Sequence, residues 1–73
     1  MCNDSTIAKL KILLGYWVDH NREHGQEFHE WAGRAVALGE SEAGDDLVVA
    51  ADEMERAGRH LSRALERLQS GEA

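Results

Sequence analysis

Two histidines four residues apart are the side chains of this sequence best suited to chemistry. They are His20 and His24, and Glu27 adds a carboxylate three residues further on. Residues four apart on a helix share one face, so the two imidazoles can act together on one divalent metal ion. Imidazole pairs of this kind suit zinc, nickel, cobalt or iron. The segment from His20 to Glu27 is therefore the first candidate for a functional site.

These polar residues interrupt a long apolar stripe. With Ile7 as heptad position a, every a and d position up to Leu38 is apolar except Asn21 and His24. A stripe of this length is typical of a helix that packs in a coiled-coil-like seam. The sequence therefore predicts a first helix at about residues 5–38. Its candidate N-terminal caps are Asp4, Ser5 and Thr6.

A second helix should follow a short loop. Residues 39–44 begin and end with glycine, and Gly39 can end the first helix in a left-handed conformation. Asp45 can then cap a second helix at about residues 45–70. Large residues at a and alanine at d favour a close antiparallel approach. The large residues are Leu47, Met54, Leu61 and Leu68, and the small ones are Ala50, Ala57 and Ala64. The predicted fold is an all-α, antiparallel two-helix hairpin.

The position of the turn decides which residues face one another. If the hairpin turns near residue 42, His60 of the second helix lies between His20 and Glu27. We therefore predict a metal site formed by His20, His24, Glu27 and His60, with Glu27 either as a ligand or as a hydrogen-bond partner of a ligand. The metal would be nickel or zinc.

The same register bears on helix packing and on assembly. It places Gly25 near Gly58, where both either bring the backbones together or are tolerated surface glycines. It also leaves apolar residues 5–14 of the first helix without a partner. A two-helix hairpin buries too little surface for independent stability, so we expect a homodimer that forms a four-helix bundle.

A purely structural interpretation of the polar residues remains open. A buried asparagine at a and a histidine at d, here Asn21 and His24, can set the register of a coiled coil at some cost in stability. Cys2 is a further candidate, because a terminal amine beside a thiolate chelates nickel or copper. It can equally be an ordinary cysteine near a frayed end. We expect His29 to be a surface residue.

Composition excludes several classes of function. The formal net charge is −6, with 14 acidic and 8 basic residues, which gives no electrostatic basis for binding nucleic acid or an anionic membrane. No apolar run is long enough to span a bilayer. A single cysteine favours a reducing cytoplasm. No catalytic signature is visible, so we do not expect an enzyme.

Part of the chain resembles a known family. The pattern Tyr16-Trp17-x2-His20-Asn21-x2-His24 and the later run from Ala57 to Leu65 are similar to a small helical domain in the C-terminal part of some CooT-type proteins. These are nickel-binding accessory factors for carbon monoxide dehydrogenase. They also begin Met-Cys, as this chain does, although the β-rich domain that should follow is not predicted here. The resemblance implicates His20, Asn21, His24 and His60, and implies nickel and a metalloenzyme maturation partner.

Two functions therefore follow from the sequence. The first is a non-enzymatic cytoplasmic homodimer that binds nickel or zinc in its polar layer, as a metal-handling or sensing module. The alternative is a structural dimerisation or interaction module whose buried polar layer sets the register of the helices.

Overall fold

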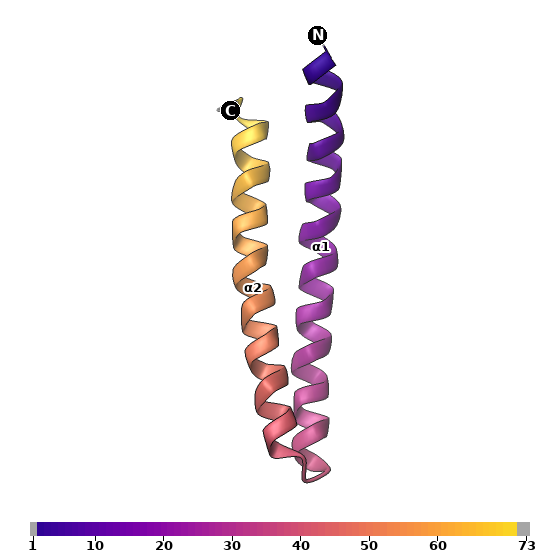
Figure 1. Ribbon diagram of the computed structural model, residues 1–73, viewed down its shortest axis with the longest axis vertical. Coiled ribbons are helices and arrows are strands. Elements are labelled where there is room, and N and C mark those ends of the chain that lie inside the picture. The colour runs from indigo at the N-terminus through magenta and orange to yellow at the C-terminus, as the bar shows by residue number, and fades with distance from the viewer. Residues whose placement is uncertain (1, 72–73) are drawn as a thin grey trace.

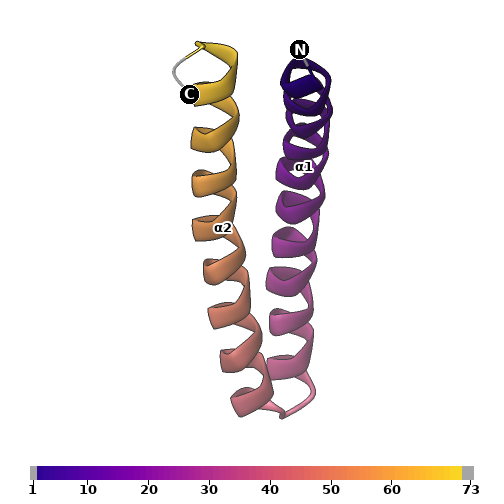
Figure 2. The same ribbon diagram turned by 45° about the horizontal axis from the view of Figure 1, so that its top comes forward.

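The computed structural model is a hairpin of two long antiparallel helices (Figure 1). It describes the backbone of residues 2–71 and the side chains of residues 5–71. Helix α1 spans Cys2–Ala37 and helix α2 spans Ser41–Gln69. The two lie side by side in both views (Figure 1 and Figure 2), and Figure 1 shows the N-terminal end of α1 extending beyond the end of α2. Residues 2–71 contain no strand, which confirms the predicted all-α hairpin.

Both helices are continuous. The chain has no proline, and α1 runs without a break through Gly25. α1 begins before the predicted start at about residue 5, so Ser5 and Thr6 lie inside the helix instead of capping it. The predicted cap Asp4 has its side chain outside the described part of the structure. Within the described chain, neither helix combines the length and hydropathy that crossing a bilayer would require.

The chain reverses over residues 38–40. Gly39 adopts a φ of 86°, the left-handed conformation that glycine tolerates best. Its N–H donates to the carbonyl of Val36 at 3.0 Å, and the N–H of Glu40 donates to the carbonyl of Ala35 at 2.8 Å. This pair of bonds is a Schellman motif, which ends α1 and turns the chain at once. The predicted loop at 39–44 was therefore too long, because α2 already begins at Ser41.

Gly44 explains how α2 can begin so early. It is buried in the first turn of α2, and an added Cβ would lie 2.7 Å from Cγ2 of Val36 and 3.0 Å from the carbonyl oxygen of Ala32. A residue that looked like part of a flexible loop is thus a packing residue. Its missing side chain lets α2 lie directly against the last turn of α1.

The two helices pack through heptad positions a and e. Leu14 at a, with Ala32 and Ala51 at e, forms the buried apolar core, each at most 5% exposed. Most of the other buried and half-buried positions continue the same two rows, and position e is mostly small. The half-buried residues beside these rows, at positions b and d, are Gly15, His24, Ala50, Ser62 and Ala64. On α1 these rows contain Ile7, Lys11, Leu14, Val18, Asn21, Gly25, Phe28, Ala32 and Ala35, and on α2 Gly44, Leu47, Ala51, Met54, Gly58, Leu61, Leu65 and Leu68.

The register differs from the prediction by about one helical turn. An added Cβ at Gly25 would lie 3.5 Å from Cβ of Met54, and one at Gly58 would lie 3.3 Å from Nδ2 of Asn21. Gly25 and Gly58 therefore do permit close approach of the helices, but they face other residues and not each other. The shift arises because the chain turns at Gly39 and not near residue 42.

Replacing Gly44 by alanine should destabilise the hairpin. Overpacking costs about 1–3 kcal/mol, and alanine recovers only about 1 kcal/mol of helix propensity. Gly33 is the matched control, because it is exposed in α1 and an added Cβ there meets nothing within 4 Å. Urea unfolding should show Gly44→Ala less stable than wild type and Gly33→Ala more stable. Equal stabilisation of both variants would contradict the close packing at Gly44.

Candidate functional site

Heptad position d of α1 lies outside the packed seam. The d residues Leu10, Trp17, Trp31 and Leu38 are 38, 40, 53 and 79% exposed. Leu13, at the neighbouring position g, is also exposed and extends the same apolar stripe. The sequence pattern placed the d residues in the seam, but small residues at e take their place there. The result is an apolar surface along α1 that nothing in the hairpin covers.

The alanines of α2 lie on the same side of the hairpin as this stripe. Positions b and d lie on opposite sides of an a/e seam in each helix. Arg22 and His29, at b of α1, line a shallow hollow together with Glu55, at b of α2. Because the b positions share one side, the d positions share the other. We call that side the open face. It comprises Leu10, Leu13, Trp17 and Trp31 of α1, Leu38 of the turn, and Ala43, Ala50, Ala57 and Ala64 of α2.

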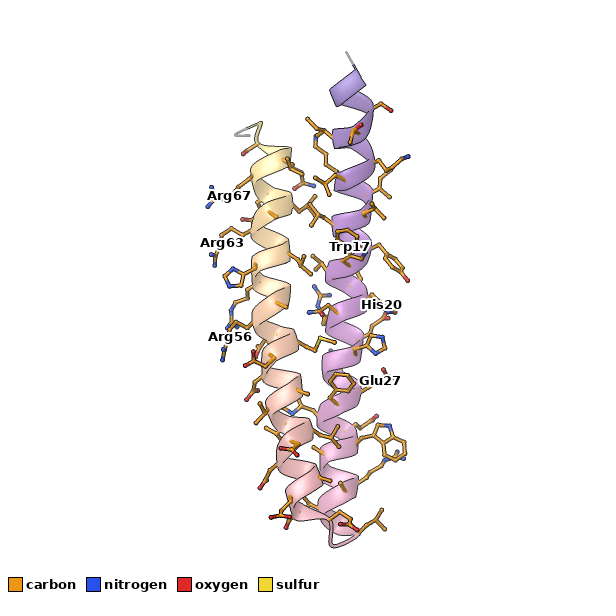
Figure 3. All side chains as sticks on the ribbon, in the orientation of Figure 1. Trp17, His20, Glu27, Arg56, Arg63 and Arg67 are labelled. Atoms are coloured by element: carbon orange, nitrogen blue, oxygen red, sulfur yellow. The ribbon has the colours of Figure 1, made fainter. Side chains whose placement is uncertain are left out.

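The two histidines and Glu27 interrupt the open face midway along α1. Nε2 of His20 lies 3.0 Å from Nε2 of His24, and Nδ1 of His24 lies 3.1 Å from Oε1 of Glu27. The imidazoles are also the middle of a column of rings. His20 stacks on Tyr16 at 5.3 Å, meets His24 edge-on at 4.4 Å, and His24 lies 6.0 Å from Phe28. In Figure 3, His20 and Glu27 lie on the side of α1 that points away from α2.

The contacts of His24 assign its protons when the ring is neutral. An ionised carboxylate can only accept, so Nδ1–H of His24 donates to Glu27. The Nε2 atom of His24 then carries a lone pair and accepts from Nε2–H of His20. Glu27 thus holds the ring of His24 in an orientation that directs the Nε2 lone pair of His24 at the imidazole of His20. This is the tautomer in which Nε2 of a histidine can bind a metal.

The structure does not bring His60 to this cluster. His60 is exposed on α2, and the described side chains give it no hydrogen bond or ring contact with His20 or His24. His60 is at position g of α2, and a seam of positions a and e leaves position g on the exposed side of the helix. Within the described residues, no three His, Cys, Asp or Glu side chains of one chain group in a way that could hold a metal ion. The side chain of Cys2 lies outside the described part.

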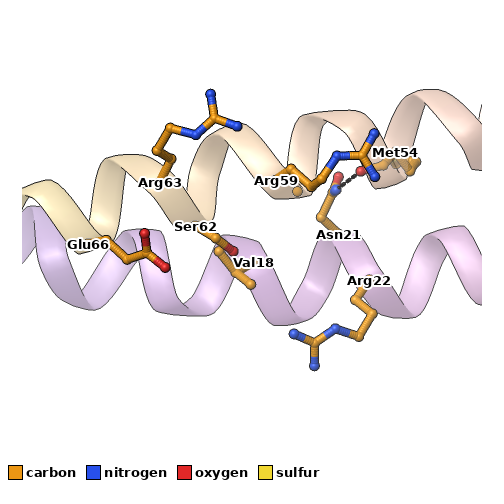
Figure 4. Close-up of a pocket in the computed structure, with 9 residues that line it drawn as sticks. Val18, Asn21, Arg22, Met54, Arg59, Ser62, Arg63 and Glu66 are labelled. Atoms are coloured by element: carbon orange, nitrogen blue, oxygen red, sulfur yellow. Dashed lines mark hydrogen bonds between the residues drawn. The ribbon is translucent and has the colours of Figure 1, made fainter.

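Asn21 has a different role from the histidine pair. It is half-buried between the helices, and its Nδ2–H donates to the backbone carbonyl of Met54 on α2 (Figure 4). This bond crosses the hairpin and fixes which turn of α2 lies opposite Asn21. The polar layer predicted from the sequence is therefore divided: Asn21 joins the two helices of one chain, and His24 belongs to the open face.

One contact on the open face was missed by the sequence analysis. The guanidinium carbon of Arg34 lies 4.6 Å from the ring centroid of Trp31, a cation–π contact. The spacing in the sequence could have predicted this contact, since an arginine three residues after a tryptophan reaches the same face of a helix. Arg34 thus covers part of a ring that remains 53% exposed.

Comparison with known proteins places the chain in a family. A family model described as a domain of unknown function (DUF8180) matches residues 10–68, most of the chain. The chain belongs to this family. The DUF8180 region contains both histidines of the cluster, Glu27, Asn21 and the a/e seam from Lys11 onward. No curated protein and no solved structure matches the chain. The resemblance to CooT-type proteins stays a prediction.

The proton assignment of the cluster can be tested by NMR. Long-range ¹⁵N–¹H correlation at about pH 8, above the usual titration range of histidine, should show His24 as the Nδ1–H tautomer and His20 as the Nε2–H tautomer. Glu27→Ala should remove the preference of His24 because its acceptor is lost. His29 is exposed and serves as the internal reference. An Nε2–H tautomer at His24 in the wild-type protein would contradict the assignment.

Proposed function

We propose that the chain is a non-enzymatic self-association module, a homodimer in which the open faces of two hairpins pack to form a four-helix bundle. The observation that supports this is the exposed apolar stripe of α1 beside the alanine stripe of α2. Together they form one continuous apolar surface on the hairpin, of the kind that is buried in the core of a four-helix bundle. The single cysteine fits a reducing cytoplasm as the location.

The exposed surface area of one hairpin is large enough for a second copy to pack against it. The hairpin exposes 5624 Å², whereas a compact monomer of 8.1 kDa exposes about 4,500 Å². Its radius of gyration is 16.5 Å, compared with about 11 Å for a compact chain of this length. The surplus of about 1,100 Å² exceeds the roughly 800 Å² that each partner contributes to a standard interface. A second copy can therefore cover the open face with surface to spare.

The sequence of the open face favours an antiparallel arrangement of the two α1 helices. Position d of α1 reads Leu10, Trp17, His24, Trp31, Leu38, the same residue types in either direction about His24. A two-fold axis at His24 therefore places Trp17 opposite Trp31 of the second copy and Leu10 opposite Leu38. A two-fold interface requires such self-complementarity.

The alanine stripe of α2 places its centre at the same level. Met54 lies midway between Ala50 and Ala57, and it faces Gly25, the neighbour of His24. One axis can therefore serve both helices. The result is a core in which alanine meets alanine along α2 and large residues meet along α1.

Charges at the edge of α1 also favour this arrangement. His20 and Glu27, both at position g, lie almost equally far from His24 on either side of it. An axis at His24 brings Glu27 of each copy opposite His20 of the other, so neither carboxylate faces a like charge there. The opposite arrangement, with both loops at one end, brings Glu27 of one copy near Glu53 of the other, a repulsive pair.

Self-association is the better supported of the two functions predicted from the sequence. The open face alone is sufficient for it. A metal site needs more ligands than the two adjacent imidazoles of one chain provide. Metal binding by the histidine pair therefore depends on dimer formation.

Leu10→Asp should dissociate the dimer. Burying an unpaired carboxylate costs several kcal/mol, so the dissociation constant should rise by about a hundredfold or more. Ile12→Asp is the matched control, because Ile12 is 74% exposed at position f of the same helix, away from the open face. Sedimentation velocity at micromolar concentration should show a dimer for wild type and for Ile12→Asp. A wild-type folded monomer, or equal effects of the two variants, would refute the proposal.

The arrangement of the two hairpins can be measured with spin labels. Ser41 begins α2 beside the loop and is exposed, so Ser41→Cys in a Cys2→Ser background carries one label per chain. The axis at His24 lies level with Met54 of α2, so the two labels should lie about 40 Å apart, from the helical rise of 1.5 Å per residue. Double electron–electron resonance should give this long distance. A distance near 20 Å would place both loops at one end and contradict the antiparallel arrangement.

A further inference from the structure

We propose that the centre of the dimer binds one divalent transition-metal ion through four imidazoles, those of His20 and His24 from each copy. This inference rests on the proposed self-association, since one chain contributes only half of the site. It follows from three features of the structure: the spacing of the two Nε2 atoms, the hydrogen bond from His24 to Glu27, and the position of His24 on the open face.

The first feature is the separation of the two ligand atoms. Nε2 of His20 and Nε2 of His24 lie 3.0 Å apart. An ion bound to both at metal–nitrogen distances of about 2.0–2.1 Å would subtend an angle of about 90°. This angle suits two neighbouring ligands of an octahedral or square-planar site, and modest opening of the pair reaches the tetrahedral angle. The ion then replaces the proton that His20 shares with His24.

The second feature is the carboxylate behind His24. Histidine ligands of metals usually donate their other ring N–H to a carboxylate or carbonyl, which fixes the ring and raises its basicity. Glu27 accepts such a bond from Nδ1 of His24 at 3.1 Å. Glu27 therefore positions the ring of His24 and does not bind the ion itself. The ligands are then neutral imidazole nitrogens only. Such a set suits nickel, zinc, cobalt or copper rather than magnesium or calcium.

The third feature is where the pair lies. Two imidazoles are too few for a closed site, and four ligands are usual for zinc. His24 is the central residue of the self-complementary stripe, so the two-fold axis passes beside it. The axis brings the pair of the second copy to the same layer. His60 is exposed and lies outside the cluster, so it supplies no ligand. The second copy supplies the missing ligands instead.

Isothermal titration of the untagged full chain with Ni²⁺ or Zn²⁺ tests this site. The expected stoichiometry is one ion for two chains. His24→Ala should weaken binding at least a hundredfold, and Glu27→Gln by about tenfold to a hundredfold. His29→Ala and His60→Ala are matched controls that should leave binding unchanged. The titration is repeated with Cys2→Ser, so that a thiolate site at the terminus is separated from the histidine site.

Two further measurements keep the result interpretable. Circular dichroism identifies a variant that fails to fold, and His20→Ala then replaces His24→Ala as the ligand variant. Substitution with Co²⁺ reports the ligands directly, because its visible spectrum should change when either histidine is replaced and should not change with Cys2→Ser. A spectrum that depends on Cys2 alone would overturn the proposed site.

Sedimentation with chelator and with metal separates failure of the site from failure of the dimer. A dimer that binds no ion, or that binds one ion per chain, overturns the metal site and leaves self-association intact. A monomer under both conditions overturns both proposals. Loss of binding in His60→Ala would overturn the ligand set in favour of one that includes α2. A dimer that binds one ion per two chains, and tightens when the ion is added, is the result expected here.

Discussion

Close contact between the two helices, made possible by small residues at position e, determines the rest of this molecule. Gly44, Gly25 and Gly58 let each backbone lie against a side chain of the other helix, as the 2.7–3.5 Å distances from their virtual Cβ atoms show. This contact uses the narrow a/e seam, so position d turns outward. The largest apolar residues of α1 are consequently left on the surface. Both the open face and the outward position of the histidine pair follow from this packing through positions a and e.

Much of the fold could be predicted from the sequence. Absence of proline and the long heptad stripe were sufficient for two helices, and Gly39 was recognised as the end of the first. The start of α2 was not predictable from local pattern, because Ser41 to Asp46 has a composition compatible with both a loop and the polar first turn of a helix. Only the space beside Val36 and Ala32 shows that Gly44 is packed.

The site was harder to predict than the fold. His20, His24 and Glu27 follow from helical periodicity, because their contacts lie within one helix. His60 depended on which heptad rows of the two helices face each other. The observed register places His60 close to the level of His20, but the a/e seam leaves position g of α2 exposed. Periodicity also cannot choose between d and e as the partner of a, since both rows lie beside it. Gly25 and Gly58 at e held the relevant signal, because glycine within a packed helix usually marks a close approach.

The polar residues in the middle of the chain therefore have two separate tasks. Asn21 joins α1 to α2 through its bond to the Met54 carbonyl, and so fixes the hairpin. His24 faces outward with its lone pair set by Glu27, and so is available to whatever covers the open face. A second copy fits that role because the stripe is self-complementary about His24.

The central claim is that the open face of one hairpin packs against the open face of another. Trp17 and Trp31 lie about 21 Å apart along one α1 helix, from its rise per residue, which is too far for a nuclear Overhauser effect within one chain. Isotope-filtered spectra of a mixture of labelled and unlabelled chains should show cross-peaks between the ring of Trp17 in one copy and that of Trp31 in the other. Their absence at a concentration where the protein sediments as a dimer would contradict the account.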